Sequence, residues 1–121
     1  MSPLRIIGIW RYHNDPDLSE MVDLEWDQYE AEELSDYLEF GTLIGVTMSG
    51  PAKCRLCDFV LPNDLMFTDG VYQWHQLLFH YVREHKVRLP GKVVSDMLDR
   101  LHALQESESD ISWWRETARV V

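Results

Sequence analysis

The chain is poor in cysteine, with only Cys54 and Cys57 among its 121 residues. Two cysteines separated by two residues cannot form the disulfide framework of a small secreted protein. The chain also lacks an apolar run of about 20 residues, the length that spans a bilayer, and its first residues lack the pattern of a signal peptide. We therefore expect a cytoplasmic protein that has no membrane partner.

Basic residues are also scarce, and their distribution is uneven. The chain has 11 Lys and Arg against 21 Asp and Glu, a formal net charge of −10. Residues 12–52 contain eleven acids and no Lys or Arg. This charge argues against a protein that wraps nucleic acid, and it predicts either a solvated surface or a binding face for a basic protein. Asp27, Glu30 and Glu33 are the candidates for such a face.

The composition fits one globular domain of the α+β class. Hydrophobic residues make up 45% of the chain and charged residues 26%, which provides enough apolar material for a core. We expect a single zinc-binding domain over residues 1–121, with an acidic part at 12–52, a zinc module at 53–92, and a helix and tail at 93–121. The predicted architecture is a small antiparallel sheet and a ribbon-like zinc hairpin packed against about three helices.

Hydrophobic periodicity predicts where the elements of this fold lie. The predicted strands are 4–10, 42–48, 65–67 and 71–74, and the last two form a hairpin around Asp69-Gly70. The predicted helices run from about 26 to 40, from 74 onward, and over 94–104. Gly41 is expected to end the first helix in the left-handed conformation, and residues 105–110 are predicted to be a loose polar segment.

The strongest chemical signal is the pair Cys54 and Cys57 followed by His75, His80 and His85. Two thiolates with two residues between them can face one ion, because the backbone turns tightly between them. Two histidines with three to five residues between them supply the second half of a tetrahedral zinc site. Both His75 with His80 and His80 with His85 have that spacing, so His80 is a ligand in either pairing.

The choice between the two pairings depends on where the second helix ends. Five positions along a helix rotate a side chain by about 140°, so one of the two rings needs to lie where the helix begins or opens. His85 meets that condition, because residues 86–90 end in proline and break the helix just beyond it. The expected ligands of a structural Zn2+ ion are therefore Cys54, Cys57, His80 and His85, with His75 as the alternative.

The ligand spacing predicts a structural site rather than a reactive one. Residues 58–79 separate the two half-sites, more than the roughly 12 residues of a DNA-reading finger, which favours a zinc-ribbon or treble-clef arrangement. Four protein ligands leave no position for substrate water. A redox cysteine pair would need a helix beginning at Cys54, and a zinc hydrolase with Glu84 as its base would need one ligand displaced.

Several motifs of the chain resemble a group of small bacterial proteins that have no assigned activity. They are CRLC at 54–57, TDGVYQW at 68–74 and HYVREHKVRLP at 80–90, together with residues 22–27 and 36–41. The resemblance covers most of residues 5–95. That group usually has proline at the position of His75 and keeps the equivalents of His80 and His85, so the resemblance implies the latter pair as ligands. The apolar residues 59–61 depart from the polar residues typical of the group.

These observations predict a non-catalytic bacterial zinc protein that acts by protein–protein recognition, as an accessory, adaptor or immunity-type protein with a basic partner. The alternative is a nucleic-acid-associated zinc module, and a zinc hydrolase comes third. The bases available to the alternative are Lys53, Arg55, Arg83, Lys86, Arg88 and Lys92. Trp113 and Trp114 are predicted either to anchor a partner or to fold back so that one of them seals the core.

Overall fold

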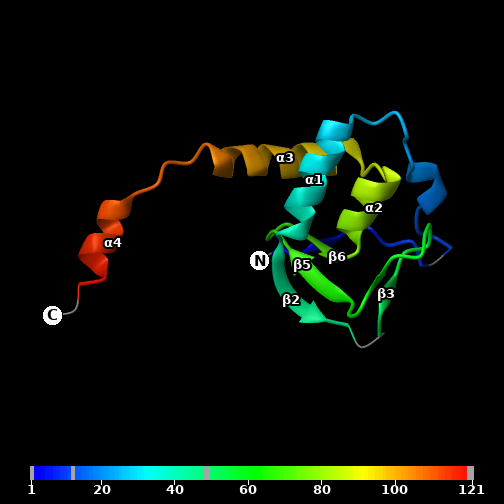
Figure 1. Ribbon diagram of the computed structural model, residues 1–121, viewed down its shortest axis with the longest axis horizontal. Helices are drawn as coiled ribbons and strands as arrows, with labels where there is room; N and C mark the ends of the chain where they lie inside the picture. Colours follow the sequence, from blue (N-terminus) through cyan, green and yellow to red (C-terminus); the bar gives the residue numbers. More distant parts are fainter. Residues whose placement is uncertain (1, 12, 48–49, 120–121) are drawn as a thin grey trace.

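The centre of the fold is a four-stranded sheet in the order β1-β6-β5-β2 (Figure 1). The computed structural model describes residues 2–11, 13–47 and 50–119. The strands of this sheet are β1 Arg5–Ile6, β2 Thr42–Val46, β5 Leu65–Thr68 and β6 Tyr72–His75. The α+β class is confirmed, but the sheet is mixed rather than antiparallel, because β1 runs parallel to β6. A two-stranded sheet pairs β3 Ala52–Lys53 with β4 Val60–Leu61.

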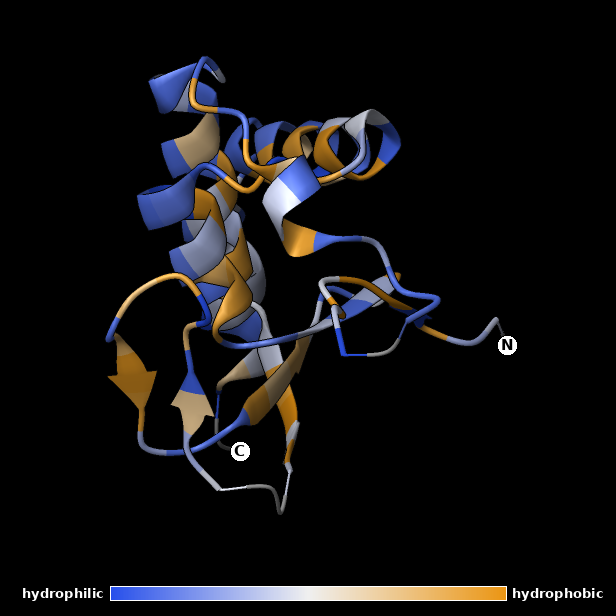
Figure 2. Ribbon diagram, turned by 90° about the vertical axis from the view of Figure 1, so that its right-hand side faces the viewer, coloured by the Kyte–Doolittle hydropathy of each residue, from blue (hydrophilic) through white to orange (hydrophobic). Residues whose placement is uncertain are grey.

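The longer helices pack beside this sheet, and the last helix lies apart from them (Figure 1). The helices are the 3-10 helix η1 Leu18–Met21, α1 Gln28–Glu39, α2 Leu78–His85, α3 Gly91–Gln105 and α4 Ile111–Thr117. Helix α1 contacts both α2 and α3. Figure 2 shows hydrophilic and hydrophobic residues alternating along the helices, as expected when one side faces a core. Among the described residues, no helix has the length and hydropathy of a membrane span.

Helix α1 begins after an aspartate cap, Asp27, and ends for a different reason than predicted. The Asp27 carboxylate accepts a hydrogen bond from the Tyr29 N–H at 3.3 Å. Gly41, which follows the helix, does not have a positive φ, so the predicted left-handed stop is wrong. A Cβ atom at Gly41 would lie 2.7 Å from Cζ2 of Trp74. Glycine is therefore required there by the close approach of the indole.

Trp74 lies in the main core, and its position corrects the predicted start of the second helix. The side chain is fully buried, and its indole N–H donates to the Leu38 carbonyl oxygen at 3.1 Å. The prediction of a helix from residue 74 is wrong, because Trp74 belongs to β6 and α2 begins at Leu78. Tyr72 and Trp74 are buried while the residues that follow each of them are half-buried. Alternating burial is typical of a strand. The helical spacing of the apolar residues from Trp74 onward obscured this pattern in the sequence.

The predicted hairpin around Asp69-Gly70 is confirmed, with residues 69–71 connecting β5 to β6. Gly70 has a φ of 95°, a left-handed conformation that glycine adopts without steric cost. The Asp69 carboxylate accepts hydrogen bonds from the N–H groups of Val71 and Tyr72, at 2.9 and 2.8 Å. The aspartate therefore orders the turn through its own side chain.

Asp69 also ties the hairpin to two helices. The Tyr37 hydroxyl of α1 donates to the carboxylate at 2.7 Å, and the Arg100 guanidinium of α3 donates at 2.6 Å. Burial and the hydrogen bond to Asp69 raise the pKa of Tyr37 to about 12. Burial alone would raise the pKa of Asp69, but hydrogen bonds from the Tyr72 N–H and the Tyr37 hydroxyl, with the charge of Arg100, outweigh burial and lower that pKa.

The strands near the start of the chain are shorter than predicted. The strand expected over 4–10 is confined to Arg5–Ile6, because Gly8 turns the chain with a φ of 72°. A Cβ atom at Gly8 would also lie 3.0 Å from Cδ1 of Leu78. The strand predicted over 42–48 is observed as far as Val46, and Met48 lies outside the described residues.

The C-terminal segment does not fold back onto the core. None of the residues of α4 is buried, and Trp113 and Trp114 are 62% and 60% exposed. The expectation that one of them seals the core is therefore wrong. The predicted loose segment is observed as the connection 106–110 between α3 and α4. This connection holds α4 away from the rest of the molecule (Figure 1).

We expect Gly41→Ala to destabilise the protein by about 1–3 kcal/mol, the usual cost of overpacking a core, because the new methyl group meets the Trp74 ring. The measurement is the free energy of unfolding in urea. Gly91→Ala is the matched control, since a Cβ atom there has no neighbour within 4 Å. Equal stability of the two variants would contradict the packing argument.

We expect Asp69→Asn to lower the free energy of unfolding by about 2 kcal/mol at neutral pH, the scale of hydrogen bonds to a charged group. A lowered carboxyl pKa contributes stability above the unfolded-state pKa of about 3.9, and this contribution is lost as the pH falls further. The difference between the two proteins should therefore shrink as the pH falls below about 4. Asp99→Asn, at an exposed position of α3, serves as the control and should show no such convergence.

Candidate metal centre

The four preferred ligands meet where the β3–β4 hairpin contacts α2. Cys54 and Cys57 lie in the turn between β3 and β4, His80 lies near the start of α2, and His85 is the last residue of that helix. One ligand atom from each side chain lies within 4.8 Å of all the others. Within the part of the chain that the structure describes, these four side chains lie close enough together to hold a metal ion.

The distances between the donor atoms fit a tetrahedral ion. Sγ of Cys54 lies 3.4 Å from Nε2 of His85, and Sγ of Cys57 lies 3.3 Å from Nε2 of His80. Around zinc, with bonds of about 2.3 Å to sulfur and 2.0 Å to nitrogen, tetrahedral ligands are roughly 3.3–3.8 Å apart. The two imidazole rings are inclined at 75°, so their Nε2 atoms approach the cluster from different directions. The four side chains could thus share one ion.

The backbone of the turn directs both sulfurs toward α2. The Leu56 N–H donates to Sγ of Cys54 at 3.3 Å, and the Phe59 N–H donates to Sγ of Cys57 at 3.5 Å. The Cys54 N–H bonds to the Phe59 carbonyl oxygen at 3.0 Å and closes the turn. N–H groups that point at sulfur favour the thiolate, the form that binds a metal. The two-residue spacing of the cysteines is what allows this turn to present both sulfurs.

His85 reaches the cluster because α2 ends there, as the sequence predicts. Lys86 adopts a left-handed conformation with a φ of 50°. The N–H groups of Lys86 and Val87 both bond to the Tyr81 carbonyl oxygen, a helix-closing pattern. The Lys86 ammonium group then donates to the Trp26 carbonyl oxygen at 2.5 Å. This contact fixes the chain just beyond the last ligand.

Aromatic side chains support the cluster from two sides. The Phe59 ring stacks on the His80 imidazole, with centroids 4.2 Å apart and planes inclined at 10°. This contact gives a role to Phe59, one of the apolar residues 59–61 that follow the cysteine pair. On the other side, the Tyr81 hydroxyl accepts a hydrogen bond from the Arg55 N–H at 3.0 Å, and Trp10 packs against the Tyr81 ring edge-on. The hairpin is therefore held to α2 without an ion as well.

Burial shifts the ionisation of two of the four ligands. It raises the pKa of the Cys54 thiol, although the Leu56 N–H acts in the opposite direction. It lowers the pKa of His80, and the charge of His85 acts in the same direction. The neutral imidazole of His80 is the form that binds a metal. The Cys54 thiolate would gain its main stabilisation from the positive charge of a bound ion.

His75, the alternative ligand, lies outside the cluster and has a different partner. Its Nδ1 lies 2.8 Å from Oδ1 of Asp64, whose side chain is only 6% exposed. The Thr47 hydroxyl donates to the same carboxylate at 3.0 Å, and Arg11 lies 3.6 Å from it. Sequence reasoning missed Asp64, because its burial depends on contacts between segments far apart in the chain. No local pattern of residues marks it.

The predicted partner-binding acids of residues 27–33 and the predicted partner-binding tryptophans do not lie in one site. Asp27 caps α1, Glu30 accepts a hydrogen bond from the Trp26 indole at 3.0 Å, and Glu33 pairs with His102 at 2.7 Å. Trp113 and Trp114 lie on α4, apart from α1 (Figure 1). The acids and the tryptophans are therefore separate surface features.

The chain has also been compared with protein-family models, curated proteins and solved structures. No match is found in any of the three comparisons.

We expect the purified, untagged protein to contain about one metal ion per chain, and Cys54→Ser, His80→Gln and His85→Gln to lose it and to melt at a lower temperature. Elemental analysis and thermal unfolding are the measurements. His75→Gln is the matched control, because glutamine can still donate to Asp64 and the residue lies outside the cluster. Loss of metal in His75→Gln, with retention in His85→Gln, would contradict the assignment of ligands.

Proposed function

We propose that the protein is a non-catalytic recognition domain stabilised by one structural zinc ion. The observation that supports a bound metal is that two sulfurs and two imidazole nitrogens lie within 4.8 Å of one another. Two cysteines and two histidines are donors typical of tetrahedral zinc. Four protein ligands close the coordination shell, so the ion has no position for a substrate or a reactive water.

The local fold supports a structural role for the ion. Strands β3 and β4 have two residues each, and a hairpin this short is not stable by itself in water. An ion bound by Cys54 and Cys57 on one side, and by His80 and His85 on the other, would link the hairpin to α2. Metal binding then adds to the stability of the folded state, because the unfolded chain has no preformed site.

The recognition surface in this proposal is the acidic part of the chain, residues 12–52. A surface of one charge sign attracts a partner of the opposite sign and steers its approach. The groups that donate to Asp27 and Glu30 are a backbone N–H and an indole N–H. Because these donors are neutral, they hold the carboxylates in place without neutralising them. Both charges therefore remain available to a basic protein.

The basic residues of 53–92 favour this proposal over a nucleic-acid module. Arg83 pairs with Asp36 at 2.5 Å, and Arg88 pairs with Asp23 at 3.0 Å. The Lys86 ammonium group donates to a backbone carbonyl oxygen. A cation that already faces a carboxylate or a carbonyl oxygen has to give up that contact to bind a phosphate, so it adds little to the affinity for nucleic acid. The neighbouring acids also repel the phosphate.

A set of four protein ligands also favours a structural role for the ion over a role in hydrolysis. A hollow of about 560 Å³ lies beside Cys57, His80 and His85, and Glu84 lines it. Glu84 could act as a general base there only if one of the four ligands left the ion. The four side chains of the cluster lie close enough to supply all four ligands, which favours the structural role.

The proposal predicts that the protein captures a basic protein from native cell lysate at low ionic strength and releases it at high ionic strength. The triple variant Asp27→Asn, Glu30→Gln and Glu33→Gln should lose this capture. It removes three charges but keeps the oxygens that accept the hydrogen bonds of α1. Mass spectrometry identifies the captured protein.

The matched control is Glu106→Gln, Glu108→Gln and Glu116→Gln, which removes the same charge from exposed positions near the C-terminus. It should capture the partner as the wild type does. Equal capture by both triple variants, or no salt-sensitive partner at all, would overturn the recognition role. A metal content of iron, or none, would separately overturn the structural zinc.

A further inference from the structure

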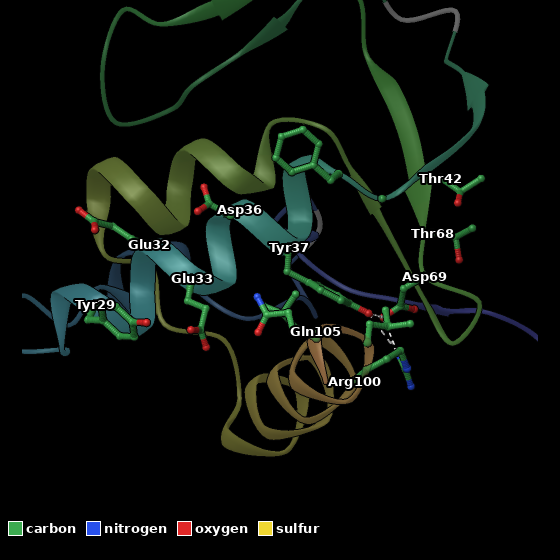
Figure 3. Close-up of a pocket in the computed structure, with 14 residues that line it drawn as sticks. Tyr29, Glu32, Glu33, Asp36, Tyr37, Thr42, Thr68, Asp69, Arg100 and Gln105 are labelled. Carbon is green, nitrogen blue, oxygen red and sulfur yellow. Dashed lines mark hydrogen bonds and ion pairs between the residues drawn. The ribbon is translucent and has the colours of Figure 1, made fainter. Parts of the chain in front are cut away.

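A groove of about 610 Å³ lies between α1 and α3 (Figure 3). Its apolar lining includes Tyr29 near the start of α1, Phe40 just after the end of α1, and Leu104 near the end of α3, which are 72%, 82% and 65% exposed. Glu32 and Glu33 line the side formed by α1. The groove is therefore an apolar surface with an acidic edge.

The groove exists because the hydrophobic stripe of α3 extends beyond the core. Met97 is fully buried, Leu101 is half-buried and Leu104 is exposed, although the three lie on one face of the helix at positions i, i+4 and i+7. At the inner end of the groove, Tyr37 reaches from α1 toward Asp69 and Arg100 (Figure 3). The buried part of the stripe thus ends at this polar contact, and the rest faces solvent.

Helix α4 has the complementary features and no contact that buries it. It has seven residues, whereas isolated helices shorter than about 12 residues are marginal in water. The Asp110 carboxylate caps it by accepting hydrogen bonds from the N–H groups of Ser112 and Trp113. Its apolar side chains Ile111, Trp113 and Trp114 are about 60% exposed. Such a helix needs a surface to pack against.

We infer that α4 of one molecule docks in the groove between α1 and α3 of a second copy of this chain. Ile111, Trp114 and Arg115 share one face of α4 at positions i, i+3 and i+4. That face would place apolar side chains against the groove and the Arg115 guanidinium beside its acidic edge. Glu32 and Glu33 supply the opposite charge there.

A second copy fits better than the same molecule because of the way the chain leaves α3. The N–H of Ser107 bonds to the Leu104 carbonyl oxygen at 3.2 Å, and its hydroxyl donates to the Ala103 carbonyl oxygen at 2.8 Å. These bonds complete the end of the helix, and the chain then continues away from α1, the helix that forms the other side of the groove (Figure 1). A two-fold exchange of α4 would cover both grooves at once.

The surface involved is large enough for a specific dimer. A tryptophan buries about 150–250 Å² when fully covered, and a two-fold exchange would cover two of them, Trp114 of each copy, together with Ile111 and the stem of Arg115. With the groove surface opposite, the interface would bury on the order of 1,000 Å² or more, near the lower size of specific protein interfaces. The inference does not depend on the proposed recognition of a basic protein or on the metal.

Sedimentation of the purified full chain over a range of concentrations tests the inference. We expect a monomer–dimer equilibrium, with a dissociation constant that rises at least about tenfold in the double variant Trp113→Ala and Trp114→Ala, since tryptophans are frequent interface hot spots. Leu104→Gln, in the groove, should weaken the dimer in the same direction. Leu24→Ala is the control, because Leu24 is 78% exposed but lies in neither α4 nor the groove.

Three results would overturn the inference. A monomer at every concentration with shielded Trp113 and Trp114 fluorescence would mean that α4 packs on its own molecule. A monomer with solvent-exposed tryptophans would leave α4 free for a different protein. A dimer that neither set of variants weakens would use another surface. None of these results would affect the salt-sensitive capture of a basic partner, so the two proposals fail independently.

Discussion

The packing of the Trp74 indole against α1 is the contact on which the position of the metal cluster depends. The indole is fully buried, bonds to the carbonyl oxygen of Leu38, and lies so close to Gly41 that no side chain fits there. It thereby fixes β6 beneath α1. Helix α2 follows β6 after two residues, so the place of His80 and His85 in space follows from this one contact.

The apolar interior is divided between a large and a small cluster, and Cys54, one of the candidate metal ligands, belongs to the smaller one. The large cluster fills the space between the helices and the four-stranded sheet. The small cluster joins Cys54 to Leu18, Leu77, Tyr81 and Val87. A hairpin with two-residue strands contributes little apolar area to this second cluster. A bound ion would supply the stability that packing alone provides elsewhere in the molecule.

Several charged side chains form ion pairs within the molecule itself. Several acids of residues 12–52 pair with bases that come later in the chain, as Asp36 does with Arg83 and Asp23 with Arg88. These pairs join the acidic part to residues 53–92. They also occupy cations that a nucleic acid would need for binding its phosphates. Recognition of a basic protein and association of two copies would share Glu33 but otherwise use separate features. The first depends on uncompensated carboxylates, and the second on apolar surface left uncovered at α3 and α4.

The sequence by itself determined the features that depend on local spacing. Turn and helix geometry depend on residues a few positions apart. Four features follow from such short-range patterns: the cysteine turn, the cap of α1, the hairpin at Asp69-Gly70 and the end of α2 after His85. Tertiary structure decided the rest. Burial in the sheet placed Trp74 in a strand despite its helical spacing, the indole required glycine at position 41, and contacts between distant segments buried Asp64 beside His75. The hydrophobic periodicity of α3 could not reveal that its apolar face extends beyond the core, because the extent of a core depends on which distant segments cover it.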